Sequence, residues 1–185
     1  VVGEAEIAHP SDGEDILAAL GHHHRPLHDG PPPQDSDLGL VREVRRRRAD
    51  LGLATDGDAD RFGIVDRSGL FIPPNDVISL LLEYLIQTRP RAPLVARTLA
   101  TTHRVDAIAS AYGLDVEETP VGFKYIGEIL SGGNCLLGAE ESAGLSIRHH
   151  VPEKDGILAC LLVAEMVASR RKSLREMMRS LNRKY

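Results

Sequence analysis

Three carboxylates at alternate positions are the residues of this chain with the clearest chemistry. The stretch Ala54-Thr-Asp-Gly-Asp-Ala-Asp-Arg61 spaces Asp56, Asp58 and Asp60 two residues apart and places Arg61 directly after them. Three carboxylates that converge on one point repel one another unless a cation neutralises them, and such hard oxygen ligands suit Mg²⁺, with Mn²⁺ as a substitute. The guanidinium of Arg61 offers paired donors to a phosphate beside that metal. The pattern therefore predicts a metal site next to a phosphate-binding group.

Two other interpretations of this loop compete with the metal site. An EF-hand calcium loop also begins D-x-D-x-D, but counted from Asp56 its sixth position holds Arg61 instead of Gly and its twelfth holds Arg67 instead of Glu. The EF-hand interpretation therefore fails. The alternative is a solvated acidic turn, because Asp and Gly are common turn residues. The apolar runs on both sides, at 51–55 and 62–65, predict two buried strands that would hold the loop between them, which favours the metal site.

The segments upstream of the loop predict a weaker pattern of elements. Residues 1–9 alternate as in a strand, a helix is expected over 13–20, and another over 37–49 leads into the first buried strand. The run His22-His-His24 is interpreted as a polar loop, because consecutive side chains point in different directions and cannot share one metal. Gly30-Pro-Pro-Pro33 predicts a turn or a polyproline segment, and Arg45-Arg-Arg-Arg48 a solvated helix end.

Downstream of the loop, the sequence alternates between strand and helix patterns. Asp66–Gly69 predicts a hairpin turn and Ile72–Asn75 a linker, with Asn75 as the cap of a helix over 76–87. A domain boundary is placed near residue 70. The remaining expected elements are strands at 94–98, 115–118 and 135–137, helices at 102–112 and 122–130, and two C-terminal helices, the last from about Ser173. This alternation predicts an α/β fold.

Composition excludes several classes of protein. A formal net charge of −5 argues against a nucleic-acid-binding protein. No apolar run is long enough to span a membrane, since Glu165 interrupts the longest one, at 157–168. Cys135 and Cys160 lie in apolar surroundings without a C-x-x-C pair, which predicts buried free thiols and a cytoplasmic location. The chain starts at Val1 with no signal-peptide pattern and no initiator Met, which suggests a piece of a longer protein.

Four motifs in order resemble a known family. The Asp loop is followed by Thr119-Pro-Val-Gly-Phe-Lys-Tyr-Ile126, Ala139-Glu-Glu-Ser-Ala-Gly144 and Glu153-Lys-Asp-Gly156. Together they resemble the metal-binding loop, the T-P-x-G-F-K-x-I segment, the G-E-E-S-G-G sugar-recognition loop and a helix start of the α-D-phosphohexomutases, the phosphoglucomutase and phosphomannomutase superfamily. The resemblance implies two consecutive α/β domains, each a mixed sheet packed between helices. Residues 1–70 would be similar to the second domain of the family, ending in the metal loop, and residues 71–185 to the third.

The resemblance implies an isomerase of carbohydrate metabolism that acts as an intramolecular phosphotransferase. In that family a phosphoserine and a hexose 1,6-bisphosphate intermediate move phosphate between C1 and C6 of a hexose phosphate. Carried over to this sequence, Asp56, Asp58 and Asp60 would bind Mg²⁺ and Arg61 would stabilise the phosphoryl oxygens. The substrate-binding residues would be Lys124, Glu140 and Ser142, with the sugar loop leaning toward glucose phosphate over mannose phosphate.

Each of these residues has a plainer interpretation. On local sequence alone Lys124 reads as a surface lysine of an amphipathic helix. Glu141 is expected to face solvent, because two adjacent carboxylates repel each other within one site. The remaining polar residues near these motifs are interpreted as loop residues or have no assigned role: Arg97, His149, His150, Lys154 and Asp155.

Two family segments have no match in the chain. The nucleophile segment T-A-S-H-N-P is absent, its nearest stretch by composition being His9-Pro-Ser11, and so is the R-x-S-G-T-E-P phosphate loop of the fourth domain. A central part of a phosphohexomutase, without its first and fourth domains and inactive alone, is the first hypothesis. A non-catalytic module that binds a metal and a sugar phosphate is the alternative. A phosphatase with an Asp nucleophile is the third, and Arg61 stands where that class requires a different residue.

Overall fold

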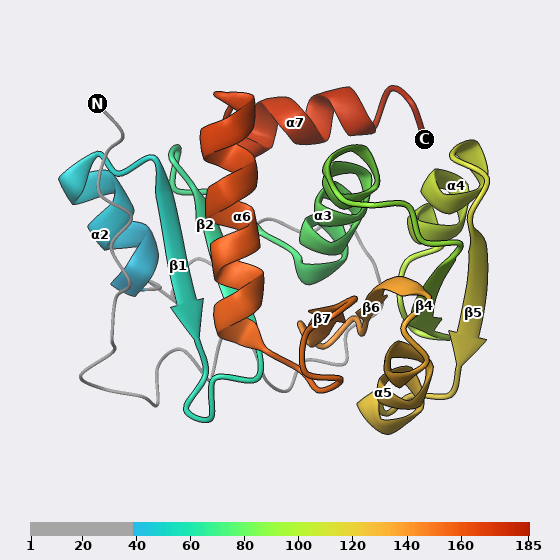
Figure 1. The fold of residues 1–185 in the computed structure, drawn as a ribbon. Coiled ribbons are helices and arrows are strands. Elements are labelled where there is room, and N and C mark those ends of the chain that lie inside the picture. The colour runs from blue at the N-terminus through green and yellow to red at the C-terminus, as the bar shows by residue number, and fades with distance from the viewer. Residues whose placement is uncertain (1–38) are drawn as a thin grey trace.

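The computed structural model describes residues 39–185, which form two β-sheets packed with helices (Figure 1). This confirms the expected α/β class. The elements predicted before residue 39, with the His22–His24 run, lie outside the described residues. The first sheet follows helix α2 (Gly39–Arg47) and consists of β1 (Leu51–Thr55), β2 (Phe62–Asp66) and β3 (Phe71–Ile72). The other elements are α3 (Pro74–Thr88), β4 (Leu94–Thr98), α4 (Arg104–Ala111), β5 (Asp115–Thr119), α5 (Phe123–Ser131), β6 (Cys135–Ala139), β7 (Leu145–Ile147), α6 (Gly156–Arg170) and α7 (Leu174–Leu181).

The first sheet holds the Asp loop between two paired strands, as expected. β1 and β2 are antiparallel, with Leu53 opposite Ile64 and Thr55 opposite Phe62, so the loop leaves and re-enters one hairpin. The turn at 66–69 is also present, since the amide of Gly69 donates to the carbonyl of Asp66 at 2.7 Å. Nearly every residue of β1 and β2 is buried, because both α2 and α6 pack against this sheet.

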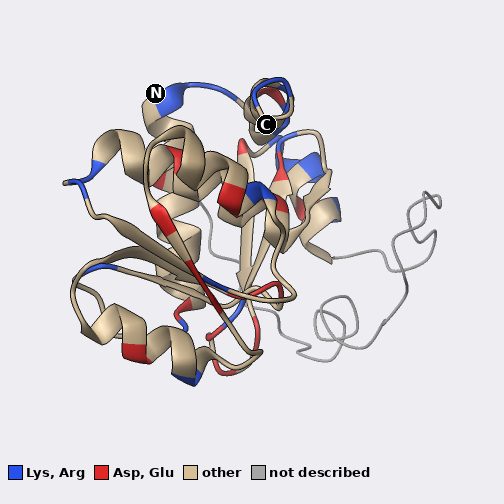
Figure 2. Cartoon of the chain, turned by 90° about the vertical axis from the view of Figure 1, so that its right-hand side faces the viewer, with Lys and Arg blue, Asp and Glu red and all other residues tan. Residues whose placement is uncertain are grey.

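The second sheet has the strand order β5-β4-β6-β7. β4 is parallel to both β5 and β6, whereas β7 is antiparallel to β6. β5 is an edge strand, and Figure 2 shows acidic residues along it; Asp115, Glu117 and Glu118 are exposed there. Charged side chains on an edge strand disfavour pairing with another chain.

Helices α3 and α6 join the two sheets. One cluster of buried side chains includes Leu53 of the first sheet, Leu81 of α3, Val163 of α6 and Leu137 of the second sheet. The last helix begins near Ser173, as expected, because Ser173 and Glu176 form a reciprocal capping box. The loops that follow β1 and β6 are therefore carried by elements that share a single core. The division near residue 70 stays a prediction.

Two expectations about the start of α3 were wrong, and two short strands were missed. The 72–75 linker does not exist, because Ile72 belongs to β3 and Pro74 opens α3. Asn75 does not cap the helix, since Pro74 has a backbone already set for the first helical position and the helix starts two residues earlier than expected. The Asn75 side chain accepts a hydrogen bond from the amide of Thr102 instead, at 3.2 Å. The short strands β3 and β7 were missed, because two or three residues carry too little periodicity to recognise.

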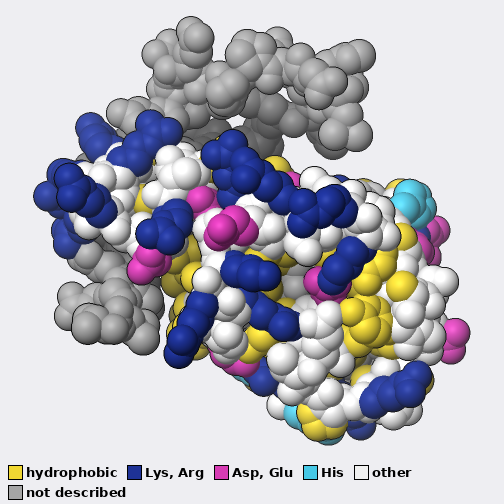
Figure 3. Space-filling model, turned by 90° about the horizontal axis from the view of Figure 1, so that it is seen from above, with side chains coloured by type: hydrophobic (Ala, Val, Ile, Leu, Met, Phe, Trp, Pro, Cys, Tyr) yellow, Lys and Arg dark blue, Asp and Glu magenta, His cyan; other side chains and the backbone are white. Residues whose placement is uncertain are grey.

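The two cysteines and the arginine run have the environments that the sequence predicted. Cys135 and Cys160 are buried free thiols, and burial raises their pKa to about 11 and about 12. Residues 45–48 are exposed at the end of α2, where Arg46 and Arg47 pair with Glu43. Figure 3 shows Lys and Arg side chains gathered on this face of the molecule. Among residues 39–185, no helix combines the length and the apolar character that crossing a membrane requires.

Candidate functional site

The three predicted carboxylates converge. One oxygen each from Asp56, Asp58 and Asp60 lies within 4.8 Å of the other two. The loop closes because the amide of Ala59 donates to the carbonyl of Asp56 at 3.1 Å, with Ala59 in the left-handed region at φ 60°. The amide of Arg61 donates to Asp56 Oδ1 at 3.1 Å and fixes that side chain. The backbone therefore turns tightly enough to aim alternate side chains at one point.

The side chain of Arg61 lies beside the carboxylates without a hydrogen bond to them. Its Nε is 3.9 Å from Asp56 Oδ2 and 3.9 Å from Asp60 Oδ1, too far for a hydrogen bond. This Nε is buried and, within the described part of the chain, is the one buried side-chain nitrogen or oxygen without a hydrogen-bond partner. A buried donor without an acceptor is costly. The arrangement leaves the Arg61 guanidinium available to an anion next to the carboxylates.

The loop carboxylates differ in their electrostatic environment. Burial raises the pKa of Asp56, and the negative charges of Asp60 and Asp58 raise it further, against the opposing effect of the Arg61 amide. Burial also acts to raise the pKa of Asp60, but the hydrogen bond and charge of Lys154 outweigh it and lower that pKa. The Lys154 ammonium lies 2.6 Å from Asp60 Oδ2. Lys154, together with the charge of Arg61, thus neutralises part of a triad that still carries excess negative charge.

The carboxylates fit a small divalent cation. Neighbouring oxygens on one octahedral Mg²⁺ are about 3 Å apart and opposite ones about 4 Å apart, since each Mg–O bond is about 2.1 Å long. The three carboxylate oxygens, which lie within 4.8 Å of one another, would turn further inward to bind one ion. The donors are all carboxylate oxygens, the ligand type that Mg²⁺ and Mn²⁺ prefer. Asp56, Asp58 and Asp60 are therefore the residues that could hold the predicted metal.

The second predicted loop, between β6 and β7, is built around Glu140. Its side chain is buried, with only 5% of the residue surface exposed, at the end of β6. Glu140 Oε1 accepts a hydrogen bond from the amide of Gly122 at 3.0 Å, and Oε2 is 3.4 Å from the Ser142 hydroxyl, which donates to it. The main-chain amide of Glu140 donates to the carbonyl of Gly144 at 2.8 Å. Glu140 therefore ties the 119–126 segment to the 139–144 loop.

Glu141 does not face solvent, and that expectation was wrong. Its Oε2 accepts a hydrogen bond from the Thr98 hydroxyl at 2.8 Å, and that hydroxyl is also 2.8 Å from the hydroxyl of Thr101. The two adjacent carboxylates avoid repulsion because Glu140 points toward Gly122 while Glu141 points toward the end of β4. Sequence reasoning missed this support, since the partners of Glu141 are distant in the chain.

Arg97 anchors the same end of β4. Its side chain is only 3% exposed and forms ion pairs at 2.8 Å with Asp106 of α4 and with Glu118 of β5. Burial raises the pKa of Asp106, but the hydrogen bonds from Arg97 outweigh burial and lower it. Arg97 thus joins β4, α4 and β5 immediately before Thr98, and its role is to hold these elements together.

The other predicted residues are more exposed. Lys124 lies on the exposed face of α5, with its ammonium 4.7 Å from the centre of the Tyr125 ring. Ser142 is exposed next to Glu140. His149 and His150 are exposed loop residues, as expected, and His150 Nε2 lies 2.8 Å from Asp155, whose carboxylate caps α6. Sequence reasoning assigned no role to Lys154, although its E-K-D-G segment is one of the matching motifs.

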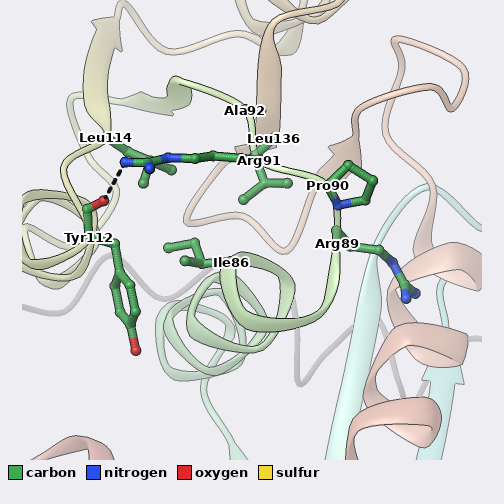
Figure 4. Close-up of a pocket in the computed structure, with 8 residues that line it drawn as sticks. All are labelled: Ile86, Arg89, Pro90, Arg91, Ala92, Tyr112, Leu114 and Leu136. Atoms are coloured by element: carbon green, nitrogen blue, oxygen red, sulfur yellow. Dashed lines mark hydrogen bonds between the residues drawn. The ribbon is translucent and has the colours of Figure 1, made fainter.

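These loops share one edge of the molecule. Figure 1 shows the loop after β1, the carboxyl ends of β4 and β5 and the start of α6 along the lower edge. Ligands of α/β sheets bind outside the carboxyl ends of the strands. A cavity of about 260 Å³ lies at the other ends of the strands, lined in part by Ile86, Arg91 and Leu136 (Figure 4). It contains none of the predicted residues and is distinct from the candidate site.

Comparisons with known proteins agree with this arrangement. Residues 73–185 match the family described as phosphoglucomutase/phosphomannomutase, alpha/beta/alpha domain III, and residues 21–69 match alpha/beta/alpha domain II of the same family. The first match alone covers more than half of the chain. The chain belongs to the phosphoglucomutase/phosphomannomutase family.

Individual relatives extend the comparison. Human phosphoglucomutase-1 is 32% identical over 152 residues, which are 79% of this chain and 26% of that protein. A phosphoglucomutase of Rhizobium radiobacter is 34% identical over 69% of this chain and 24% of its own length. A putative phosphomannomutase from Thermus thermophilus has a similar structure, with a TM-score of 0.74 and 34% identity over 81% of this chain and 34% of the other. The chain spans about a quarter of the length of these curated relatives.

Proposed function

We propose that this chain supplies the metal-binding and sugar-binding parts of a phosphohexomutase, an enzyme that moves phosphate between C1 and C6 of a hexose phosphate. The observation that carries the proposal is the convergence of Asp56, Asp58 and Asp60 within 4.8 Å, beside the unbonded Nε of Arg61. Such a site suits a divalent cation next to a phosphoryl group. The family membership supports the same reaction, because the matching segments come in the family's order.

Each residue would have a defined task. The three Asp carboxylates would hold Mg²⁺, or Mn²⁺ in its place, and that ion when bound would supply positive charge for the phosphoryl group in transfer. Arg61 would donate to phosphoryl oxygens. Glu140 would accept hydrogen bonds from sugar hydroxyls, because the amide of Gly122 uses Oε1 and leaves lone pairs on both oxygens. Ser142 and Lys124, which reach solvent next to this loop, would add a hydroxyl and an ammonium donor.

The remaining parts of the reaction would come from outside this chain. The phosphoserine that gives and takes back phosphate belongs to a segment that the sequence does not contain. The partners of the chain would be a hexose phosphate, a hexose 1,6-bisphosphate and the first and fourth domains of the parent enzyme. A cytoplasmic location, and the absence of nucleic-acid and membrane partners, belong to the same proposal.

A titration with Mn²⁺, followed by water-proton relaxation, tests the proposal. We expect saturable binding to one site, and then binding of glucose 1,6-bisphosphate that is tighter with Mn²⁺ than without it. Turnover of glucose 1-phosphate by this chain alone would instead show that the chain contains a nucleophile. It would overturn the proposal that the phosphoserine is supplied from outside this chain. Mn²⁺ binding without any effect on the bisphosphate would favour a metal-binding module that has no sugar-phosphate site.

A further inference from the structure

The end of α6 and the whole of α7 carry a high density of positive charge. Residues 170–185 contain seven Lys and Arg residues and one acidic residue, Glu176, whereas the chain as a whole has a net charge of −5. All seven cationic side chains are exposed: Arg170, Arg171, Lys172, Arg175, Arg179, Arg183 and Lys184. A chain with an excess of carboxylates therefore presents one strongly basic surface, which Figure 3 shows from above.

Helix α7 arranges three of these arginines in a row. Leu174 and Leu181 are buried and fix which side of the helix faces the core. Arg175, Arg179 and Arg183 follow one another at intervals of four residues on the exposed side, the last in the turn that continues the helix. Four residues of a helix rise by about 6 Å. The row therefore places one guanidinium about every 6 Å along the surface.

The row has no acidic partner within the structure. Among residues 39–185, neither the three arginines of the row nor Arg171 form an ion pair with their side chains. Glu176 is already engaged, since its Oε2 accepts hydrogen bonds from the amide and the hydroxyl of Ser173, both at 2.8 Å. These bonds lower the pKa of Glu176 and hold its carboxylate at the start of α7. The row thus presents positive charge to solvent without neutralisation.

The basic surface continues from α7 to the end of α2. The amide of Arg175 donates to Asp66 Oδ2 at 3.2 Å, so α7 begins on the hairpin turn at 66–69. The charge of Arg67 in this turn contributes to the lowered pKa of Glu176. On the same turn, a Cβ added at Gly69 would lie 2.9 Å from Arg45 Cγ, which places the Arg45 side chain over the turn. We call this surface the basic face: Arg45, Arg67, Arg171, Lys172, Arg175, Arg179 and Arg183.

We propose that the basic face binds an extended acidic segment of a partner protein, with Asp or Glu at alternate positions. Alternate side chains of an extended chain lie on one side, about 7 Å apart, which is close to the spacing of the arginine row. A guanidinium pairs with a carboxylate through two parallel hydrogen bonds. In Figure 1, α7 lies at the top and the loops of the candidate site lie along the lower edge, so this interaction is independent of the metal and sugar sites.

The other common anionic partners match this surface less well. A nucleic acid extends beyond the row and would meet a chain with a net charge of −5, and residues 170–185 expose no aromatic side chain on which a base could stack. A membrane surface favours apolar side chains that insert, and no large apolar side chain of these residues is exposed. A partner helix docks through an apolar stripe and has nothing to pack against here.

Fluorescence anisotropy with synthetic peptides tests the proposal. The probe is a labelled peptide of alternating Glu and Ser, about ten residues long, which exceeds the length of the row at about 3.3 Å per residue. We expect saturable binding that weakens about tenfold when salt is raised from about 0.01 M to about 0.15 M, because screening shortens the reach of exposed charges. A peptide of alternating Gln and Ser should not bind. A peptide with the same Glu and Ser in two blocks should bind about threefold more weakly than the alternating one.

Substitutions in the row connect binding to these arginines. Changing Arg175, Arg179 and Arg183 together to Gln should weaken peptide binding about tenfold, because three exposed charge pairs are lost. The fold should be retained, since all three side chains are exposed and Gln is a good helix former. The same three residues changed to Lys keep the charge, and affinity should stay within about threefold of wild type.

A single substitution at the opposite edge is the positional control. Arg179→Gln should weaken peptide binding about twofold, whereas Lys124→Gln, at an exposed cation of α5, should leave it unchanged. An equal loss in both variants would mean that the peptide responds to net charge alone, which would overturn the assignment to the basic face.

Three further results would overturn the proposal. Unchanged peptide affinity in the triple Gln variant removes the arginine row as the binding surface. Equal affinity for the alternating and the block peptide removes the match in spacing. Tighter binding of a mixed-sequence DNA duplex, or of vesicles with equal parts of phosphatidylserine and phosphatidylcholine, assigns the face to a different partner. Absence of Mn²⁺ binding, which overturns the metal site, leaves the basic face unaffected.

Discussion

The Asp loop and the loop at 139–144, which we propose to bind the sugar and call the sugar loop, present their polar groups in opposite ways. The Asp loop brings three carboxylates and one guanidinium together within six consecutive residues of a single hairpin. The sugar loop is assembled from distant parts of the chain: Glu140 is held by Gly122, Glu141 by Thr98, and Gly144 is covered by Lys154. A site made from one short stretch depends on local turn geometry, whereas an assembled site depends on every element that delivers a partner.

The largest expected effect is a loss of Mn²⁺ affinity from a substitution in the Asp loop. Asp58→Asn should weaken Mn²⁺ binding by about 100-fold or more, because a lost ligand costs at least as much as a lost outer-shell partner. The free energy of unfolding should change by less than about 0.5 kcal/mol, since Asp58 is exposed and its charge repels two neighbours. Mn²⁺ titration and urea unfolding measure the two quantities.

Asp115→Asn is the control for this variant, because it removes an exposed carboxylate of β5 outside the site. Retained Mn²⁺ affinity in Asp58→Asn would show that the loop is an ordinary acidic turn.

The next effect concerns the support of the sugar loop. Arg97→Met should lower the free energy of unfolding by about 2 kcal/mol, because Asp106 and Glu118 lose their buried cationic partner. The loss is limited because solvent reaches and screens both carboxylates. Mn²⁺ affinity should stay within a factor of about two, since the Asp loop does not depend on β4. Arg91→Met, at an exposed arginine, is the control.

The Arg97 variant also has a pH signature. Arg97 lowers the pKa of Asp106 below its ordinary value of 3.8, so this pair stabilises the wild type above that pH and is lost as the pH falls through the lowered pKa. Arg97→Met should lose that part of the acid sensitivity. The free energy of unfolding is measured for both proteins between about pH 2 and pH 6. If it depends on pH in the same way in wild type and in Arg97→Met, Arg97 does not lower the pKa of Asp106.

A smaller effect separates ligand binding at the two loops. Glu140→Gln keeps the acceptor for the Gly122 amide but removes the negative charge, so affinity for glucose 1,6-bisphosphate should fall about tenfold while Mn²⁺ affinity stays unchanged. Calorimetric titrations of both ligands measure this. Glu128→Gln, on the exposed face of α5, is the control. Equal losses for both ligands would mean that the loops do not bind separately.

The smallest effect compares one alanine in each loop. Ala59 and Ala143 both lie in the left-handed region, at φ 60° and φ 71°. Ala59→Gly should raise the free energy of unfolding by about 0.5 kcal/mol, because glycine adopts this conformation without strain. Ala143→Gly should be near neutral, since Ala143 is buried and loses the burial of its methyl group. Thermal unfolding measures both, and an equal gain in the two loops would show that burial of Ala143 contributes nothing.

The accuracy of the sequence analysis follows the same division. The strands predicted at 51–55, 62–65 and 94–98 are present, the second ending one residue later than expected, because each has an apolar run bounded by turn residues. Helix α3 was predicted with the wrong cap, since two successive prolines override the capping preference of Asn75. The environment of Glu141 was predicted wrongly and Lys154 was assigned no role, because their partners Thr98 and Asp60 are not neighbours in sequence.

The sequence by itself determined the α/β class and the resemblance to phosphohexomutases, and it singled out the three carboxylates that we propose as metal ligands. These depend on residues that are close in the chain or on motifs in a fixed order. Only the tertiary structure decided that Glu140 and Glu141 point to different partners, that Arg97 locks three elements, and that Lys154 reaches Asp60 across Gly144. These contacts form when helices α3 and α6 bring the two sheets together on one core, and no local pattern encodes that packing.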